Sequence, residues 1–412
     1  MGFIVSFAAL LLSVVLLQLG SGGIAPLDAI SGVELGFSTA QIGLLGSAHF
    51  VGFFLGCWWA PRLMGEVGHS RAFAAFTAAG TIGILSHMLI VDPYAWMAMR
   101  IMSGLCIAGC YTVVESWLQA KVTNETRGRT MGAYRFVDIG ASLGAQLMIS
   151  ILPPANYVSY NVLAIVCCVS LVPLVLTRIK QPPLPVAPRL RPAMALKLSP
   201  LATLGVISAG LTAAAFRMVG PLYGVEIGLT IDDIALFLAA FVLGGVVAQV
   251  PAGWLADRFD RRWVLIGLSG LAILSCFLVV LFSAQGAAAA FLTAGLFGLA
   301  TFPIYSVSAA HAHDFANDEE RIELSAALMF FFAAGAIISP WTVSQLIEAY
   351  GPSAMFAFVS VAHVVLIIFG LLRMRKRATE TRTAYVYAPR TTFTIGHLMR
   401  RLRNPSKRDD DR

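Results

Sequence analysis

The sequence predicts an all-α integral membrane protein, in which twelve transmembrane helices form two pseudo-symmetric six-helix halves. Hydrophobic residues make up 58% of the 412 positions and charged residues only 12%, with a mean hydropathy of +0.78. A soluble protein of this length would carry roughly twice that charge. In addition, apolar runs close to the ~20 residues that cross a bilayer follow one another along almost the whole chain.

Most runs are separated from the next by a segment that contains charged residues, Pro or Gly. The first run lacks a basic leader and continues through Pro26, so we interpret it as a membrane helix and not as a signal peptide. The expected spans of the first half are residues 3–27, 38–60, 71–91, 94–118, 131–152 and 157–178. Those of the second half are residues 199–223, 233–256, 263–284, 286–311, 323–348 and 352–373.

The basic residues test both the number and the orientation of these spans. If the N-terminus is cytoplasmic, every Lys and Arg except Arg100 and Arg217 falls on the cytoplasmic side. No expected external loop contains one. Because basic residues accumulate in cytoplasmic loops, the pattern predicts that both termini are cytoplasmic.

The composition changes between the sixth and seventh runs. Residues 179–198 contain repeated Pro without an apolar run, which predicts a semi-rigid cytoplasmic linker and not a helix. We therefore expect a six-helix bundle at residues 1–178, a second at 199–373, and a basic cytoplasmic tail at 374–412. The tail is either solvated or adheres to anionic lipid through Arg400, Arg401 and Arg403. A shift of 192 residues, which places Ile42 on Ile234, aligns similar segments of the two halves.

A short charged segment follows the eighth run. Its pattern is Gly253-x-x-x-Asp257-Arg258-x-x-Arg261-Arg262, which resembles the signature loop of the major facilitator superfamily of secondary transporters. The resemblance extends over nearly all of residues 1–375 and includes the branches that hold drug exporters and unassigned transporters. It implies two parallel repeats around a central cavity lined by helices 1, 4, 7 and 10. It also implies that this loop, through Gly253, Asp257, Arg258, Arg261 and Arg262, forms a conformational switch. We expect His311, His313 and Asp314 to be the partners of its arginines.

Charged residues inside the apolar runs are the candidate functional residues, because burying charge in a membrane is unfavourable. Arg100 precedes Gly104 by four residues, which resembles a motif of the family's fourth helix whose Arg is associated with proton coupling. Arg217 lies at a similar depth on the seventh run, and Asp28 near the outer end of the first. Together they predict an anion-binding site or an Arg–Asp outer gate. The alternative is that one Arg extends to the outer interface.

Further polar candidates lie toward the cytoplasmic side and in mid-span. Glu115 ends the fourth run, and Arg135 and Asp138 open the fifth with a spacing that permits an ion pair. These groups either couple transport or fix helix ends at the interface. His49 and His363 lie in mid-span, as packing residues or as a proton relay. Gly140 and Gly144, four positions apart on the fifth run, permit close helix packing.

Other classes of function lack their residues. The sequence has no phosphate-binding loop, no nucleophile elbow and no metal-binding His pair, so we predict no enzyme, no catalytic residue, no metal and no cofactor. We predict a proton-coupled secondary transporter for a small organic solute in the bacterial cytoplasmic membrane, with export slightly favoured. The alternatives are an uptake symporter for an anionic metabolite and a non-transporting sensor on the same fold. The expected partners are the solute, protons and lipid, but not nucleic acid, and we expect a monomer.

Overall fold

The computed structural model describes residues 2–121, 127–176, 190–317 and 320–374. Within these ranges every regular element is a helix. The helices of the first half are α1 (Gly2–Gly22), α2 (Ile24–Glu34), α3 (Thr39–Val67), α4 (His69–Ser86), α5 (Pro93–Lys121), α6 (Arg127–Leu147), the 3₁₀ turn η1 (Met148–Ile151), α7 (Tyr157–Val169) and α8 (Leu171–Val175). Those that follow are α9 (Pro192–Leu198), α10 (Pro200–Glu226), α11 (Ile231–Arg258), α12 (Arg261–Phe282), the 3₁₀ turn η2 (Ser283–Gln285), α13 (Ala287–Thr301), α14 (Pro303–His313), α15 (Arg321–Tyr350) and α16 (Ala354–Met374).

The twelve predicted spans are confirmed as helices in the part of the chain that the structure describes. Each coincides with one helix or with consecutive helices, and ten of them are long and apolar enough to cross a membrane on those criteria alone. The remaining two, α4 and α6, fall short of those criteria. In α6 the reason is the polar side chains, including Arg135 and Asp138, that face a cavity described below.

The first span is longer than predicted. It consists of α1 and α2 and continues to Glu34 instead of ending near residue 27. The two helices are divided where Pro26, which has no N–H group, cannot donate to the carbonyl of Gly22. Asp28 therefore lies inside α2 and is buried, and it does not mark the end of the span.

The internal repeat is reproduced in the local structure of the two halves. Ser38 begins α3 with a capping box, in which its hydroxyl accepts from the Gln41 N–H and the Gln41 side chain accepts from the Ser38 N–H. Thr230 and Asp233 form the same reciprocal pair at the start of α11. The preceding glycines, Gly36 and Gly228, both have positive φ angles, 76° and 80°. Each pair is related by the same shift of 192 residues, so the halves are structural repeats.

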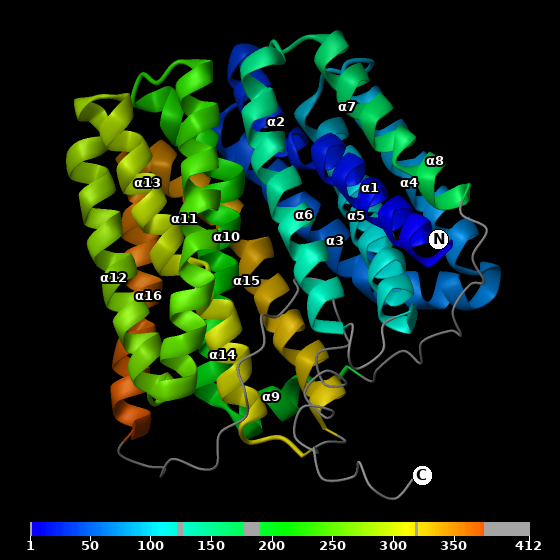
Figure 1. Cartoon of the computed structure of the whole chain (residues 1–412). Coiled ribbons are helices and arrows are strands. Elements are labelled where there is room, and N and C mark those ends of the chain that lie inside the picture. The colour runs from blue at the N-terminus through cyan, green and yellow to red at the C-terminus, as the bar shows by residue number, and fades with distance from the viewer. Residues whose placement is uncertain (1, 122–126, 177–189, 318–319, 375–412) are drawn as a thin grey trace, which may run out of the picture.

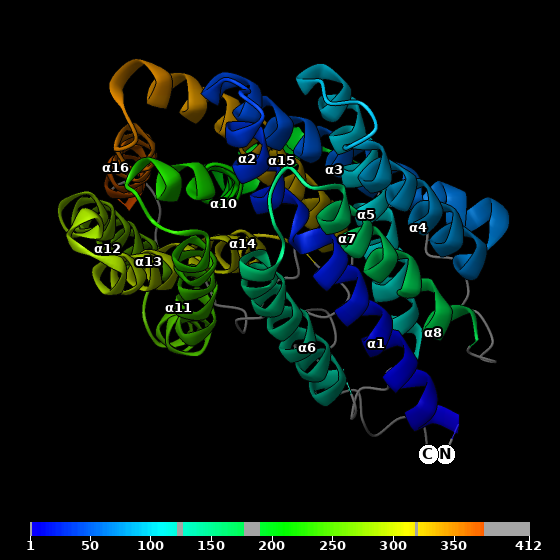
Figure 2. The same cartoon turned by 90° about the horizontal axis from the view of Figure 1, so that it is seen from above.

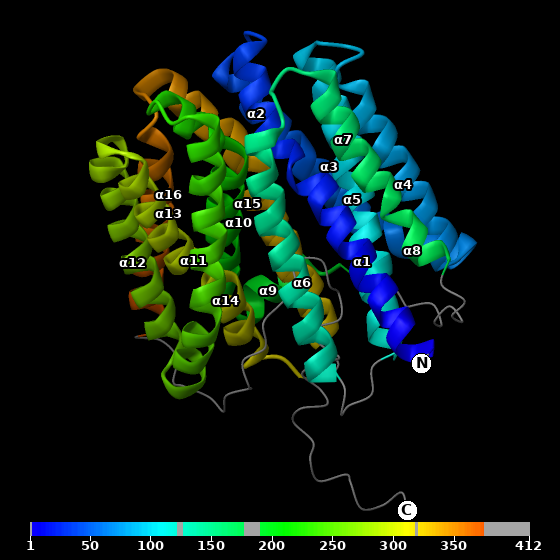
Figure 3. The same ribbon diagram turned by 45° about the horizontal axis from the view of Figure 1, so that its top comes forward.

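The helices form two groups that meet along a central seam. Figure 1 shows α1, α4, α7 and α8 on one side and α12, α13 and α16 on the other, with α6, α10 and α15 between them. Seen from above, α2 and α3 face α10 and α15, while α6 faces α11 (Figure 2). We call the end of the bundle at which α1 begins the proximal end, and the end at which α2 stops the distal end (Figure 3).

The closest contacts between the halves lie toward the distal end. Gly46 of α3 packs against Met218 of α10 and Pro340 of α15, and the backbone N–H of Trp341 donates to the Ser47 hydroxyl at 3.1 Å. The absence of a side chain at Gly46 permits this approach. The two halves are therefore packed together distally.

One part of the predicted linker is helical. Residues 192–198 form α9, which was expected to be irregular. Pro192 occupies the first turn, where its missing N–H has no intrahelical partner to lose, and the following Ala-Met-Ala-Leu-Lys-Leu are strong helix formers. Residues 179–189 of the linker and the tail after Met374 lie outside the described residues.

The outer surface of the bundle carries large apolar side chains. Leu89, Val250, Leu292 and Val361 are each more than 60% exposed, and they come from different segments in both halves. A soluble surface rarely exposes so many large apolar groups, whereas a bilayer stabilises them. The surface is that of a multi-pass membrane protein.

Candidate functional site

A cavity of about 140 Å³ lies between the two halves. It is comparable in volume to an engineered cavity that holds one benzene molecule. Its walls combine apolar rings with convergent polar side chains, as ligand sites commonly do. The polar residues that line it are Gln18, Ser21, His49, Arg100, Tyr111, Glu115, Tyr134, Arg135, Asp138, Ser142, Arg217 and Gln249.

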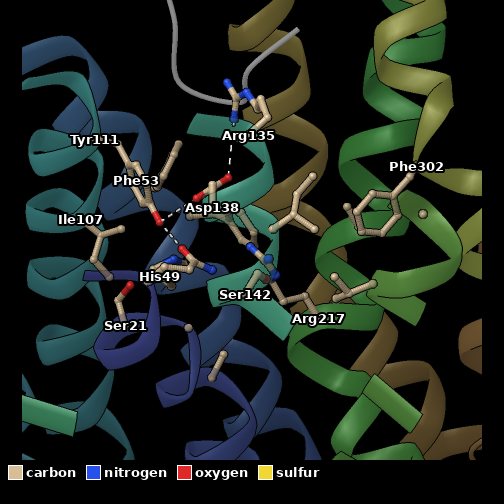
Figure 4. Close-up of a pocket in the computed structure, with 18 of the residues that line it drawn as sticks. Ser21, His49, Phe53, Ile107, Tyr111, Arg135, Asp138, Ser142, Arg217 and Phe302 are labelled. Carbon is tan, nitrogen blue, oxygen red and sulfur yellow. Dashed lines mark hydrogen bonds and ion pairs between the residues drawn. The ribbon is translucent and has the colours of Figure 1, made fainter. Parts of the chain in front are cut away.

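Arg217 and His49 lie at the centre of the cavity. Arg217 extends from α10 and His49 from α3, on opposite sides of the seam, and both are directed into the space that Asp138 of α6 also lines (Figure 4). Arg217 is half-buried and lines the cavity. A guanidinium in such a site is well suited to bind a carboxylate or phosphate oxygen.

A polar network lines the proximal part of the cavity. The Tyr111 hydroxyl contacts both Gln18 and Asp138, the latter at 3.4 Å. Arg135 lies 3.6 Å from Asp138 and 3.6 Å from the buried Glu115. The predicted pairing of Arg135 with Asp138 is present, and it includes Glu115 as a third charged partner.

The Tyr134 hydroxyl completes this network by donating to Glu115 at 3.0 Å. Glu115 is 1% exposed. A carboxylate at that depth is unfavourable unless it is paired and hydrogen-bonded, and Arg135 and Tyr134 supply both interactions. Glu115 is thus part of the cavity wall, deeper than a charge that merely ends a helix at the interface.

A second buried cluster lies beside the distal part of the cavity. Asp28 of α2 accepts a hydrogen bond from the Tyr160 hydroxyl at 2.9 Å, and its other oxygen lies 3.5 Å from Nε of Arg100. His87, directly after α4, places its Nε2 atom 3.5 Å from the same oxygen. All four side chains are at most 2% exposed. We call Asp28, His87, Arg100 and Tyr160 the distal cluster.

The structure separates the three charges that the sequence placed together. Asp28 and Arg100 are paired, as an outer Arg–Asp gate requires. Arg217 instead faces the cavity, with Met218, its neighbour on α10, contacting Arg100 through sulfur at 3.7 Å. The three charges therefore do not form one group: Asp28 and Arg100 lie together, whereas Arg217 lines the cavity.

The charged loop between α11 and α12 is organised around Arg261. This side chain is 2% exposed and donates to the Ala310 carbonyl at 2.9 Å and to Asp314 at 2.5 Å. Asp257 lies 3.5 Å from it. The expected partnership between the loop and Asp314 of the tenth span is thus present.

Other members of the loop have different surroundings. Asp260 caps α12 by accepting from the Arg262 N–H, and its carboxylate also pairs with the Arg262 side chain at 2.7 Å. Arg258 is exposed and lies over the Trp254 ring. Gly253 is buried in the last turns of α11.

A smaller cavity adjoins the main one on the α10–α14 side, and several hydroxyl groups contribute to its lining. It shares Ala213, Gln249, Phe302 and Phe332 with the main cavity. Its hydroxyl-bearing residues are Thr212, Thr301, Tyr305 and Ser306. It can therefore accommodate an uncharged polar group of a ligand whose charged end binds in the main cavity.

Sequence reasoning missed His87, Tyr160, Tyr111 and Gln18. His87 lies within the predicted third span, so the criterion that singled out Arg100, a polar residue in an apolar run, would have found it. The tyrosines carry no such signal, because an aromatic residue in a membrane span is usually packing. In the described part of the chain, no group of three or more His, Cys, Asp or Glu side chains is arranged to hold a metal ion.

The fold and cavity define a membrane transporter built from two structural repeats, and the comparisons identify its family. The family model of the Major Facilitator Superfamily matches residues 201–405. An uncharacterised transporter of this type from Enterobacter sp. (strain 638) is 30% identical over 360 residues, which cover 85% of this chain and 90% of the relative. The uncharacterised transporter YcaD of Escherichia fergusonii is 26% identical over 351 residues, covering 84% and 90%. The chain belongs to the major facilitator superfamily, whose members are secondary transporters and not enzymes.

Solved structures show the same fold at low sequence identity. The nucleoside transporter NupG, in the structure of a point mutant, has a TM-score of 0.77 at 12% identity, covering 89% of this chain and 99% of that one. A bacterial homologue of the human lysosomal transporter Spinster, inward-facing and occupied, has a TM-score of 0.73 at 14% identity, covering 90% and 96%. A D-xylose–proton symporter has a TM-score of 0.69 at 14% identity, covering 92% and 99%.

Proposed function

We propose that this secondary transporter carries a small organic anion, together with a proton, into the cell across the bacterial cytoplasmic membrane. The observation that carries the proposal is the position of Arg217 in a small cavity between the two repeats. A guanidinium there provides a paired, directional contact for a carboxylate. Nearby hydroxyl groups supply contacts for the uncharged part of the solute.

The volume of the cavity supports a small solute over a drug-like one. Drug-sized ligands occupy sites of about 300–1,000 Å³. The present cavity is about 140 Å³ and is lined by charged side chains from both halves, together with His49. This favours uptake of an anionic metabolite over the export of drug-like compounds that the sequence slightly favoured.

The balance of charge supports coupling to protons. Buried and half-buried groups in and beside the cavity include three arginines and three carboxylates, whose formal charges cancel: Arg100, Arg135 and Arg217 with Asp28, Glu115 and Asp138. An anion that entered alone would leave an uncompensated charge at low dielectric, which is strongly unfavourable. A proton that enters with the anion restores neutrality.

The packing of the halves supports alternating access. Their distal contact closes one side of the cavity, while Glu115 and Arg135 line the other side, nearer the proximal end. With the proximal end cytoplasmic, as the distribution of basic residues indicates, this is a state closed to the outside. Transport then requires the two bundles, which we place at residues 1–178 and 199–373, to rock about the cavity.

A thermal-shift measurement tests the anion site. Purified protein is heated with a panel of carboxylates of two to six carbons and, separately, with hydrophobic cations. We expect at least one carboxylate to raise the melting temperature of wild type and of Arg62→Ala, because a ligand that binds only the folded state stabilises it. Arg62 is an exposed control outside the cavity. Arg217→Ala should lose the shift and Arg217→Lys should retain part of it.

The contrary result is equally specific. If hydrophobic cations stabilise all variants alike and no carboxylate stabilises any, Arg217 is not an anion-binding group and the export hypothesis is favoured. For coupling, the protein is placed in liposomes that contain a pH-sensitive dye. An inward gradient of the active carboxylate should acidify the interior in wild type but not in Arg217→Ala.

A further inference from the structure

Both ring nitrogens of His87 face hydrogen-bond acceptors. The Nδ1 atom lies 2.8 Å from the carbonyl oxygen of Gly83. Because a carbonyl can only accept, Nδ1 carries the hydrogen in this contact. The Nε2 atom lies 3.5 Å from the Asp28 carboxylate and makes no hydrogen bond among the described residues. A neutral ring would therefore turn a lone pair toward a carboxylate, whereas a protonated ring would turn an N–H toward it.

Arg100 competes with His87 for the same carboxylate oxygen. Its Nε atom is also 3.5 Å from Oδ2 of Asp28, and neither approach has the geometry of a hydrogen bond. The other oxygen of Asp28 is occupied by the Tyr160 hydroxyl. One buried oxygen atom is thus shared between a permanent cation and a group that becomes a cation only on protonation.

Arg100 has a second environment within reach. It lines the cavity, and its guanidinium touches the Met218 sulfur, a neutral partner on the opposite half. Thioether sulfur is a weak acceptor, so this contact does little to hold a cation. An anion in the cavity would be a stronger partner for Arg100 than Met218.

We propose that His87 is the proton-binding residue of this transporter and that its protonation transfers Arg100 from Asp28 to the bound anion. In the step, a hydronium ion loses a proton by breaking one O–H bond, the proton forms an N–H bond at Nε2, and a water molecule remains. Asp28 then pairs with the imidazolium, and the Arg100 guanidinium turns to the solute. The inference rests on the proposed anion symport, and it assigns the proton to a residue outside the cavity lining.

The charges of the two states explain why proton and anion would bind together. With His87 neutral, Asp28 and Arg100 cancel. With His87 protonated, the distal cluster carries one excess positive charge, which is unfavourable in a buried site unless an anion accompanies it. Each ligand therefore stabilises the binding of the other, which is a coupling free energy between two sites.

Titratable and charged groups face His87 from the elements packed against it. The titratable and charged groups that face it are Asp28 from α2, Arg100 from α5 and Tyr160 from α7, whose ring stacks on the imidazole at 5.2 Å. Trp96 of α5 covers the ring from another side at 5.0 Å. His87 also follows the C-terminus of α4, where the helix dipole favours a cation. Of these groups, Arg100 is the one whose charge opposes protonation.

The test is an NMR titration of full-length protein labelled with ¹⁵N-histidine, which requires no substrate. The signal of His87 among the seven histidines is assigned by its loss in His87→Gln, or in His87→Asn if the first variant does not fold. Asp28→Asn removes the counter-ion and should lower the titration midpoint of His87. Arg100→Gln removes the competing cation and should raise it. Each shift should be about 1–3 pH units, the size expected for one charge at this distance. His363, on α16, is the internal control.

The outcomes separate this proposal from the proposed function. Opposite shifts of the His87 titration midpoint in the two variants support His87 as the proton site. This holds even if no carboxylate raises the melting temperature of the protein, because that result would overturn only the proposed anion transport. A midpoint that responds to neither variant overturns the proton site. A His87 ring that stays neutral from about pH 5 to about pH 9 in both wild type and Arg100→Gln also overturns the proton site. In that case the proposed function still stands if a carboxylate raises the melting temperature of the wild-type protein.

Discussion

Arg261 shows how one residue of a repetitive charged segment differs from its neighbours. Three arginines lie within five positions of the α11–α12 loop, and the sequence assigns them to the same switch. The structure buries Arg261 against Asp314 and two backbone carbonyls, of Ala256 and Ala310, while it leaves Arg258 exposed over Trp254. Only the side chain that points into the gap between α11, α12 and α14 is buried. The spacing of the arginines along the chain does not reveal that direction.

Arg261→Gln should destabilise the protein far more than Arg258→Gln. Removal of Arg261 leaves the carboxylate of Asp314 buried beside a neutral partner, and breaking a buried pair in this way costs about 3–5 kcal/mol. Removal of the exposed Arg258 should cost about 0–1 kcal/mol. The melting temperatures of the two variants in detergent give the comparison. Equal melting temperatures would show that Arg261 is not a structural anchor of the loop.

The sequence predicted which charged residues belong to the candidate site, but it did not predict how they pair. Arg100, Arg217, Asp28, Glu115 and Asp138 were found because charge in an apolar run is rare and therefore conspicuous. The sequence could not show which of them share a partner, since the contacts join helices that are far apart in the chain. His87 pairs with Asp28 from 59 positions away (87 − 28), and only the tertiary fold brings them together.

At the scale of the element, glycines decide how closely the helices approach one another. Gly104 of α5 lies against the backbone of α3, where an added Cβ would overlap the carbonyl oxygen of His49. Gly140 of α6, which the sequence suggested as a packing position, is exposed and has nothing within 4 Å of an added Cβ. The span boundaries were predicted well because they follow from composition. The face of each helix that packs was not, because both faces of a membrane helix are apolar.

Substitution of these two glycines by alanine should have opposite effects on stability. Gly104→Ala should destabilise the protein by about 1–3 kcal/mol or more, because the backbones of α3 and α5 must move apart. Gly140→Ala should be neutral or stabilising by up to about 1 kcal/mol, since Ala favours a helix and meets no neighbour. Thermal unfolding of the matched pair tests this. A destabilised Gly140→Ala variant would contradict the absence of neighbours at that position.

At the scale of the whole molecule, the two repeats are held closed at one end. Gly46 packs between Met218 and Pro340, and Ser47 bonds to the backbone at Trp341. The internal repeat and the twelve spans predicted the two-half architecture. They could not predict which end is closed, because the same sequence must adopt both arrangements during transport and their difference in free energy is small.

Gly46→Leu should shift the protein toward a distally open state. The added side chain would overlap Met218 and Pro340 only while the halves are closed. Spin labels at Val33→Cys on α2 and Asp232→Cys on α11, in a Cys168→Ser background that removes the exposed thiol, report the distal separation. We expect longer distances than in the unsubstituted labelled protein.

Gly270→Leu is the matched control, because Gly270 of α12 is exposed and its added Cβ meets nothing within 4 Å. Its distance distribution should be unchanged. An unchanged distribution in Gly46→Leu as well would mean that the contact at Gly46 does not determine closure.

The distal contact also has an electrical consequence. Where an aqueous cavity approaches the opposite surface of a membrane, most of the transmembrane voltage falls across the thin dry layer that remains. In the proposed state that is closed to the outside, the distal cluster would lie in that layer, and its ionisation would be exposed to a concentrated field. One elementary charge that crosses 100 mV changes in free energy by about 2.3 kcal/mol. We therefore expect the membrane voltage to drive charge into this cluster directly, in addition to the difference in proton concentration.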